Sequence, residues 1–204
     1  SGAGRDEAIP DIEIVRYTID GDPDPAFGIA GNARFETGTK PTTNPVPVVV
    51  PGGYVIQTGS KVMKLDESGG LVSGFGEDGK LTFTETLPPE DGIFDTLALP
   101  GGGTLAAGQS GGKAAFVRFR ANGKPDRSFG EDGWLVFPAG SGRRQDRASF
   151  VSPAPGGNFV ACIDAPNSAT FVARILKDGK LDPEFGDEGL VRITGMTDCG
   201  GLAS

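Results

Sequence analysis

The chain has 204 residues, a net charge of −8, 34 glycines, 16 prolines and no histidine. Its acidity argues against a nucleic-acid-binding protein, because such proteins need basic patches for phosphates, and the missing histidine excludes Ser-His-Asp and Cys-His nucleophile systems and most zinc sites. The high glycine and proline content, with 37% apolar residues, is typical of short strands joined by tight turns, and no run of about 18 apolar residues suggests a membrane span.

A polar segment stands first in the sequence, and two predicted strands follow it. Residues 1–11 are polar and rich in turn formers, so we expect a flexible tail. Residues 12–37 supply two strands, the first at residues 14–17, where β-branched and aromatic types gather. Asp20-Gly21 then has the chemistry of a hairpin turn, because glycine reaches a positive φ without steric cost.

A Phe-Gly pair follows this turn, and the whole stretch recurs. The pair is found at Phe27-Gly28, Phe75-Gly76, Phe129-Gly130 and Phe185-Gly186. A base precedes each turn, at Arg16, Lys64, Arg118 and Arg174. One glycine lies in the turn (Gly21, Gly69, Gly123, Gly179) and another follows the pair (Gly31, Gly79, Gly133, Gly189). Apolar residues at alternate positions come next and predict a strand with one buried face: Ala33 and Phe35, Leu81 and Phe83, Leu135 and Phe137, Val191 and Ile193.

From residue 46 on, a second hairpin stands before each copy. Pro-Gly-Gly begins at Pro51, Pro100 and Pro155, each time between two apolar runs, and predicts a β-hairpin. Each full unit therefore predicts four short strands, and the units cover residues 46–85, 95–138 and 149–194. Such a unit matches one blade of a β-propeller better than a solenoid coil. We expect one all-β, β-propeller-like domain over residues 12–204, with about three and a half four-stranded blades.

About three and a half blades are fewer than a closed propeller ring usually has. Propellers usually close with about four to eight blades, because closure protects the strand edges. Residues 195–204 stand where another unit would begin, without a further Pro-Gly-Gly. The chain is therefore expected to be part of a longer propeller, or half of a ring of about seven blades that a second copy completes. The homodimer is a hypothesis that rests on this count.

The repeated pattern resembles the delta-60 repeat of bacterial proteins that are mostly secreted or attached to the cell surface. The match is closest at residues 177–186, and it extends over most of residues 12–194. The second copy departs from the pattern, with Val72 where the other copies have Asp24, Asp126 and Asp182. The resemblance implies a propeller-like fold and an extracytoplasmic location: secreted, periplasmic or at the cell surface. It implies no activity, because the family carries no catalytic motif to transfer.

The Asp-rich first turn could hold Ca²⁺. Asp20, Asp22 and Asp24 have the alternating spacing of oxygen ligands. An EF-hand loop would also need glycine at its sixth position and glutamate at its twelfth, where the chain has Pro25 and Gly31. The sequence therefore assigns no metal site.

Two further motifs are interpreted as turns. Residues 74–79 satisfy the dinucleotide pattern G-x-G-x-x-G, but a strand follows instead of a helix, and Glu77 and Asp78 would repel phosphate, so no cofactor is expected. Acidic pairs recur once per unit, and we therefore interpret them as solvated loop carboxylates that are too far apart for acid/base catalysis. The pairs are Glu77-Asp78, Glu131-Asp132 and Asp187-Glu188.

The base before the turn has a candidate partner in each arginine-bearing copy. We predict structural ion pairs between Arg16 and Asp24, Arg118 and Asp126, and Arg174 and Asp182. The copy without the aspartate has Lys64 instead of arginine, in keeping with the preference of arginine for bidentate carboxylate partners. The alternative interpretation is a base that only water surrounds.

A basic cluster and two cysteines complete the candidates. Arg143, Arg144 and Arg147 are interpreted as a solvated loop, with an anionic or sugar ligand as the alternative. Cys162 and Cys199 are expected to be buried free thiols, the commoner state, while a disulfide between them would indicate an oxidising compartment.

The leading functional interpretation is a non-enzymatic repeat scaffold for binding or for cell-surface or extracellular interaction, with a carbohydrate or protein ligand at the loops. No catalytic, ligand-binding or metal-binding residue is assigned. A carboxylate-based hydrolase or lyase acting on sugars is one alternative, and a structural spacer in a larger surface protein is another. Carboxylates that converge at a central channel would favour the enzyme, and the spacer predicts no pocket.

Overall fold

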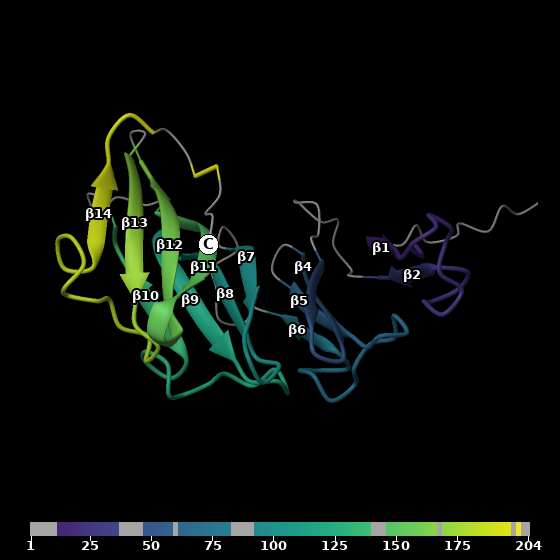
Figure 1. Cartoon of the computed structure of the whole chain (residues 1–204). Coiled ribbons are helices and arrows are strands. Elements are labelled where there is room, and N and C mark those ends of the chain that lie inside the picture. The colour runs from purple at the N-terminus through teal and green to yellow at the C-terminus, as the bar shows by residue number, and fades with distance from the viewer. Residues whose placement is uncertain are drawn as a thin grey trace, which may run out of the picture.

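The chain is an all-β protein. The computed structural model describes residues 12–36, 47–58, 61–82, 92–139, 146–166, 169–196 and 199–200. Within these residues the chain forms one two-stranded and three four-stranded antiparallel sheets (Figure 1). None of these residues forms a helix with the length and apolar composition needed to cross a membrane. The expected tail, residues 1–11, lies outside the described residues, as does Phe83.

Each sheet is built from strands that follow one another in the chain and pair with their sequence neighbours. The two-stranded sheet contains β1 (Ile12–Val15) and β2 (Asn32–Phe35). The next contains β3 (Pro47–Val50), β4 (Gly53–Thr58), β5 (Lys61–Leu65) and β6 (Lys80–Thr82). The third contains β7 (Gly92–Ala98), β8 (Thr104–Ser110), β9 (Lys113–Phe119) and β10 (Trp134–Phe137). The last contains β11 (Arg147–Ala154), β12 (Asn158–Ala165), β13 (Ala169–Ile175) and β14 (Leu190–Ile193).

The expected hairpins form where glycine allows them. The Pro-Gly-Gly segments connect β3 to β4, β7 to β8 and β11 to β12, the last through a 3₁₀ turn at Pro155–Gly157. The turn glycines before the Phe-Gly pairs have φ between 77° and 88°. Two full units begin earlier than expected, with β7 at Gly92 and β11 at Arg147, because a β-bulge early in each strand lets pairing continue past the irregularity. The first strand, expected at residues 14–17, also begins earlier, at Ile12, and ends at Val15.

The apolar core lies between successive sheets. Three buried clusters are each shared by two neighbouring sheets, and each contains the phenylalanine of one Phe-Gly pair. Phe27 packs with residues of β4 and β5, Phe75 with residues of β7 to β9, and Phe129 with residues of β11 to β13. The Phe-Gly stretch therefore does more than turn the chain, because it supplies the central core residue between its own sheet and the next.

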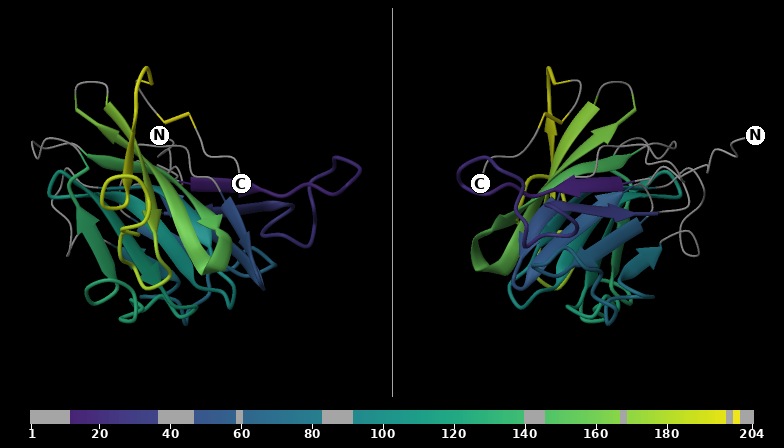
Figure 2. Two further views of the ribbon diagram at one scale, coloured as in Figure 1. Left: turned by 60° about the vertical axis from the view of Figure 1, so that its left-hand side comes forward. Right: turned by 90° about the vertical axis from the view of Figure 1, so that its right-hand side faces the viewer.

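The two-stranded sheet contains the third and fourth strands of a unit without the first two. Val15 is 40% exposed and Tyr17 is 61% exposed, whereas their counterparts Met63 and Leu65 are fully buried. Those counterparts belong to the cluster that their sheet shares with the two-stranded sheet before it, together with Ile12, Phe27 and Ala33. Figure 2, whose right-hand view faces this end of the molecule, shows the purple two-stranded sheet in front of the blue one.

Candidate functional site

Each of the three expected Arg–Asp pairs forms. The arginine Nε lies 2.8, 2.9 and 2.6 Å from the aspartate Oδ2 in Arg16–Asp24, Arg118–Asp126 and Arg174–Asp182. The aspartate also accepts a hydrogen bond from the backbone N–H two residues later, at Ala26, Ser128 and Glu184. The strand holds the base and this local turn holds the carboxylate, so the pair is positioned from both sides. The prediction of an ion pair in these three units is confirmed.

These contacts lower the pKa of all three carboxyl groups. For Asp24 and Asp182 the main cause is the hydrogen bond from the backbone N–H, and the arginine adds to it. Burial works to raise the pKa of Asp126, but the hydrogen bonds from Ser128 and the charge of Arg118 outweigh it. The three aspartates are therefore ionised partners of a structural pair rather than proton donors at neutral pH.

The same base lies over the ring of the following phenylalanine. The guanidinium carbon is 4.8 Å from the ring centroid for Arg16 and Phe27, and 4.9 Å for Arg118 and Phe129 and for Arg174 and Phe185. In the copy with Val72, the Nζ atom of Lys64 lies 6.0 Å from the ring of Phe75. A cation over an aromatic face is attracted by the ring quadrupole, so the base stabilises the position of the phenylalanine ring in every unit.

Contacts of the base and the Phe-Gly pair with the next sheet form what we call the inter-sheet joint. The base donates to a backbone carbonyl of the next sheet's turn: Arg16 to Glu67 (2.5 Å), Lys64 to Ala121 (3.3 Å) and Arg118 to Lys177 (2.6 Å). The Phe-Gly glycine N–H donates to the following carbonyl of that turn: Gly28 to Ser68 (2.7 Å), Gly76 to Asn122 (3.2 Å) and Gly130 to Asp178 (2.7 Å). The phenylalanine ring packs on the next turn glycine: Phe27 on Gly69, Phe75 on Gly123 and Phe129 on Gly179. These cross-sheet partners were not predicted from the sequence, although the shared recurrence of Phe-Gly and the turn glycine was the signal for them.

A groove opens beside the last of these joints, between the β7–β10 and β11–β14 sheets. This hairpin groove has a volume of about 560 Å³. The Pro-Gly-Gly turns and the adjoining strand ends line it, with Leu97, Leu99, Phe119, Pro153 and Phe159 as its apolar side chains. Arg120 and Asn158 add polar groups. Such a mixture of apolar lining and few polar groups is typical of a small-ligand site.

A smaller groove of about 430 Å³ lies at the equivalent place beside the first joint. Arg16, Val49 and Tyr54 line it, as Arg118, Pro153 and Phe159 line the hairpin groove. The correspondence extends to the strand register, because Val49 pairs with Tyr54 and Pro153 pairs with Phe159. The groove is therefore a feature of the repeat, and the side chains that vary between copies determine what each groove could bind.

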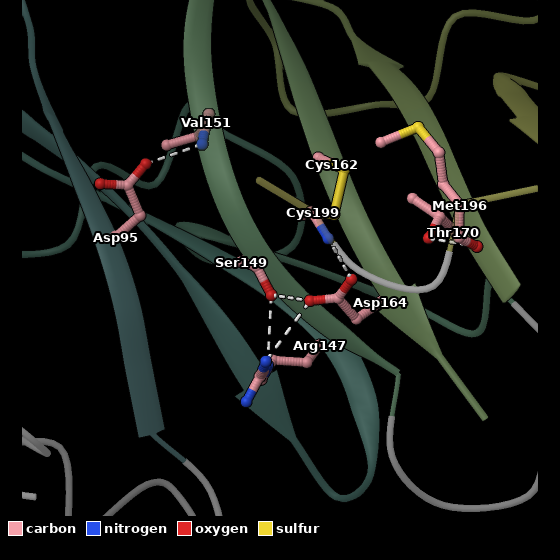
Figure 3. The surroundings of a disulfide bond; sticks show 9 residues. All are labelled: Asp95, Arg147, Ser149, Val151, Cys162, Asp164, Thr170, Met196 and Cys199. Atoms are coloured by element: carbon pink, nitrogen blue, oxygen red, sulfur yellow. Dashed lines mark hydrogen bonds and ion pairs between the residues drawn. A yellow bond between two sulfur atoms is a disulfide. The ribbon is translucent and has the colours of Figure 1, made fainter. Parts of the chain in front are cut away.

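A disulfide joins Cys162 and Cys199, and the expectation of two free thiols was wrong (Figure 3). Cys162 lies on β12, and Cys199 comes after the last strand of the same sheet. The segment after β14 returns to β12, where the Cys199 N–H donates to Asp164 Oδ1 at 2.8 Å. The sequence could not show this return, because it depends on a loop beyond the repeated pattern.

The part of the basic cluster that the structure describes belongs to the same neighbourhood. The guanidinium of Arg147 lies 4.8 Å from the ring centroid of Phe94, donates to Ser149 Oγ at 3.2 Å and lies 3.4 Å from Asp164 Oδ2. Ser149 Oγ donates to that same carboxylate oxygen at 2.5 Å (Figure 3). Arg147 is therefore engaged by its own sheet and by β7, while Arg143 and Arg144 lie outside the described residues.

Asp95 is the carboxylate of this region with a raised pKa. It reaches from β7 toward β11, where its Oδ2 accepts the Val151 N–H at 2.8 Å (Figure 3). Its Oδ1 accepts the Thr96 N–H at 2.8 Å. Burial raises the pKa of Asp95, and the two backbone hydrogen bonds oppose the shift. Each of its oxygens accepts one main-chain N–H, so Asp95 connects the two sheets as a structural acceptor.

The other acidic candidates do not converge. Both residues of each acidic pair are exposed, and Asp78, Asp132 and Glu188 occupy the positive-φ position of a turn. Asp20 and Asp22 are exposed, while Asp24 is bound by Arg16 and the Ala26 N–H. Across the described ranges, no three His, Cys, Asp or Glu side chains gather as they would around a metal ion.

Comparison with known proteins identifies a fold and no family. No protein-family model matches the chain, and no curated protein matches it. Among solved structures, it is similar to a protein from Bacteroides caccae whose function is described as unknown, with a TM-score of 0.53 and 14% sequence identity. The similarity covers 90% of this chain and 55% of the other, so this chain spans about half the length of that protein.

Proposed function

We propose that the chain is a non-enzymatic, β-propeller-like repeat scaffold that binds a carbohydrate or protein ligand outside the cytoplasm. In this arrangement each four-stranded sheet is a blade and the two-stranded sheet is half a blade. The order of the sheets supports it, because successive sheets share one core cluster each. A second copy of the chain, or further units of the same kind, belongs to the proposal as the partner.

The observation that carries the binding role is the hairpin groove and its repetition. A groove that recurs at equivalent joints, with different side chains in each copy, resembles the way in which repeat proteins vary their binding surfaces on a constant frame. Its lining of Leu97, Leu99 and Pro153 suits an apolar face of a ligand, and Arg120, with a side chain that is 61% exposed, suits an acidic or hydroxylated edge.

The enzyme alternative gains less support from the same contacts. A hydrolase or lyase of this kind needs two carboxylates beside one substrate. Asp95 and Asp164 are half-buried, but backbone N–H groups and Ser149 occupy their oxygens. The spacer alternative predicts no pocket, whereas two equivalent grooves lie between the sheets.

The extracytoplasmic location is supported by the disulfide and by the resemblance to delta-60 repeats. Disulfides persist in oxidising compartments and are rare in the cytosol. Cys162 and Cys199 are 4% and 8% exposed, so the bond is shielded from reductants once it has formed.

The binding role is tested by screening the chain against a glycan array and a displayed peptide library. Each ligand found is then measured with Pro153→Trp, which fills the hairpin groove from an exposed position on β11. Ile29→Trp is the matched control, because Ile29 is 86% exposed and lines neither groove. We expect Pro153→Trp to weaken binding at least tenfold and Ile29→Trp to leave it unchanged. Ligands that bind both variants equally well would show that the groove is not the site.

A further inference from the structure

The two ends of the sheet array carry the two complementary halves of the inter-sheet joint. One half is a base, a phenylalanine and a glycine N–H, and at the last sheet these are Arg174, Phe185 and Gly186. We call them the donor end. The other half is a turn glycine and the two carbonyls before it, which at the two-stranded sheet belong to Ile19, Asp20 and Gly21. We call them the acceptor end.

The acceptor end is already in the conformation that the joint requires. Gly21 has φ +88°, and its counterparts Gly69, Gly123 and Gly179 have φ +84°, +77° and +81°. A Cβ at each counterpart would come within 2.9, 3.1 and 2.8 Å of the phenylalanine ring that covers it. A Cβ at Gly21 would meet nothing within 4 Å, and Gly21 is exposed while the three counterparts are buried. The surface for a phenylalanine ring is therefore formed and open.

The donor end is equally prepared. Arg174 lies 2.6 Å from Asp182 and 4.9 Å from the centroid of the Phe185 ring, as Arg118 does with Asp126 and Phe129. Phe185 is half-buried, whereas Phe27, Phe75 and Phe129 are 0–1% exposed. In the part of the chain that the structure describes, no carbonyl accepts from Arg174 Nη1 or from the Gly186 N–H, the two donors that cross the joint elsewhere.

One molecule does not bring its own two ends together. The two-stranded sheet and β14 lie at opposite ends of the array (Figure 1). Two large apolar side chains are exposed at the acceptor end, Tyr17 at 61% and Ile19 at 101%. Exposed apolar side chains of this size beside an unfilled contact are typical of an interaction surface.

We propose that a second copy of this chain docks head to tail, with its donor end on the acceptor end of the first. Phe185 of one copy covers Gly21 of the other, Arg174 donates to the Ile19 carbonyl, and the Gly186 N–H donates to the Asp20 carbonyl. The contact uses two different surfaces, so it is heterologous: it closes a ring if the rotation allows, and otherwise it extends a filament. The inference rests on the repeat scaffold of the proposed function and adds to it the atoms at which the partner attaches.

The test measures the mass of the chain by light scattering and sedimentation over a range of concentrations up to about 1 mM, where even a contact with a dissociation constant of about 1 mM populates the complex. Gly21→Asn blocks the acceptor end, because asparagine tolerates a positive φ while its side chain occupies the place of the ring. Gly52→Asn is the matched control, since Gly52 has φ +79°, nothing within 4 Å of a built Cβ and no part in the joint. Phe185→Ser blocks the donor end.

We expect the wild type and Gly52→Asn to associate with equal affinity, and both end variants to weaken association at least tenfold. A mixture of Gly21→Asn and Phe185→Ser should form pairs and no larger species, because one intact donor end meets one intact acceptor end. A single-chain mass for the wild type at every concentration would overturn the inference, as would association that Gly21→Asn leaves unchanged. The ligand screen is measured separately from the mass of the chain. Failure of the proposed groove ligand can therefore be distinguished from failure of the proposed head-to-tail contact.

Discussion

The ring of Phe129 lies so close to Gly179 of the next sheet that a Cβ on this glycine would stand 2.8 Å from the ring and 2.3 Å from the Gly130 nitrogen. The two residues meet only because Gly179 has no side chain and because its φ of +81° aims the turn carbonyl before it at the Gly130 N–H. This single contact joins the turn chemistry of one sheet to the core of the sheet before it. Adding a single methyl group at Gly179 should therefore reduce the stability of the protein.

Gly179→Ala should lower the free energy of unfolding by about 2–4 kcal/mol more than Gly21→Ala does. Both glycines have nearly the same φ, +81° and +88°, so the cost of a positive φ for alanine is common to the two variants. Only Gly179 faces a ring and a backbone nitrogen. Urea unfolding at low protein concentration measures the difference, and equal losses for the two variants would mean that the joint tolerates a wider spacing.

Arg118→Lys should destabilise the protein by about 1–2 kcal/mol although it keeps the charge. The guanidinium of Arg118 donates to Asp126, Ser128 and the Lys177 carbonyl at once, and an ammonium group cannot reach the three acceptors in the same geometry. Lys64→Arg is the reverse control, because Val72 offers no carboxylate there. It should not stabilise the protein, because the added guanidinium finds no carboxylate to pair with. Denaturant midpoints for the two variants show whether the position requires only a positive charge or specifically a planar guanidinium group.

Removal of the disulfide with Cys162→Ala and Cys199→Ala should lower the free energy of unfolding by at most about 4 kcal/mol, the loop-closure value for a sequence separation of 37. The wild type in reductant should unfold at the same denaturant concentration as the double variant in buffer. Reductant should have no effect on the double variant itself. A wild type that reductant does not destabilise would show that the segment after β14 is held by its other contacts, such as the Cys199 N–H bond to Asp164.

Because the pKa of Asp95 is raised, its contribution to folding stability should change with pH in the opposite direction to that of the paired aspartates. Because burial raises its folded pKa above the unfolded value, the stability linked to its protonation is fully present below the unfolded pKa and is lost as pH rises through the folded pKa. Asp24, Asp126 and Asp182 have lowered pKa values, so their contribution is present above the ordinary range and is lost as pH falls through the lowered values.

The difference in unfolding free energy between the wild type and Asp95→Asn isolates the first effect, since the other groups cancel. That difference should fall as pH rises from about 4, the ordinary pKa of aspartate, and should become constant above the folded pKa of Asp95. Thermal melts in steps of pH measure it. A difference that rises with pH would mean that the two backbone hydrogen bonds, rather than burial, dominate the titration of this carboxylate.

The features that the sequence predicted are those that neighbours in the chain determine. Four strands per unit follow from the spacing of Pro-Gly-Gly and the turn glycines, and the Arg118–Asp126 pair follows from a base and a turn that lie on one hairpin. The limits of β7 and β11 were missed because bulges extend pairing beyond the apolar pattern. Residues 12–37 were expected to supply two strands, and β1 and β2 confirm this.

Contacts between sheets could not be predicted in the same way. Phe129 and Gly179 belong to different units, and nothing in either stretch alone indicates that they touch. The disulfide was missed because Cys199 lies beyond the repeated pattern, and the hairpin groove was missed because strand ends of two different sheets form it together. The repeat did contain one usable signal: a phenylalanine and a glycine that recur together in every unit are candidates for a contact between units.

The sharing of each core cluster by only two successive sheets also sets how the molecule should lose its structure. In such an array each sheet is stabilised by its interfaces with the sheets next to it, so the stability of a sheet depends on how many neighbouring sheets pack against it. The two-stranded sheet packs against one other sheet, and β1 and the segment that connects it to β2 carry four of the seven large apolar side chains that are exposed in the described residues. Backbone amides of β1 and β2 should therefore exchange with solvent first, and protection should increase toward β8, β9 and β12, so that unfolding proceeds inward from one end rather than in a single step.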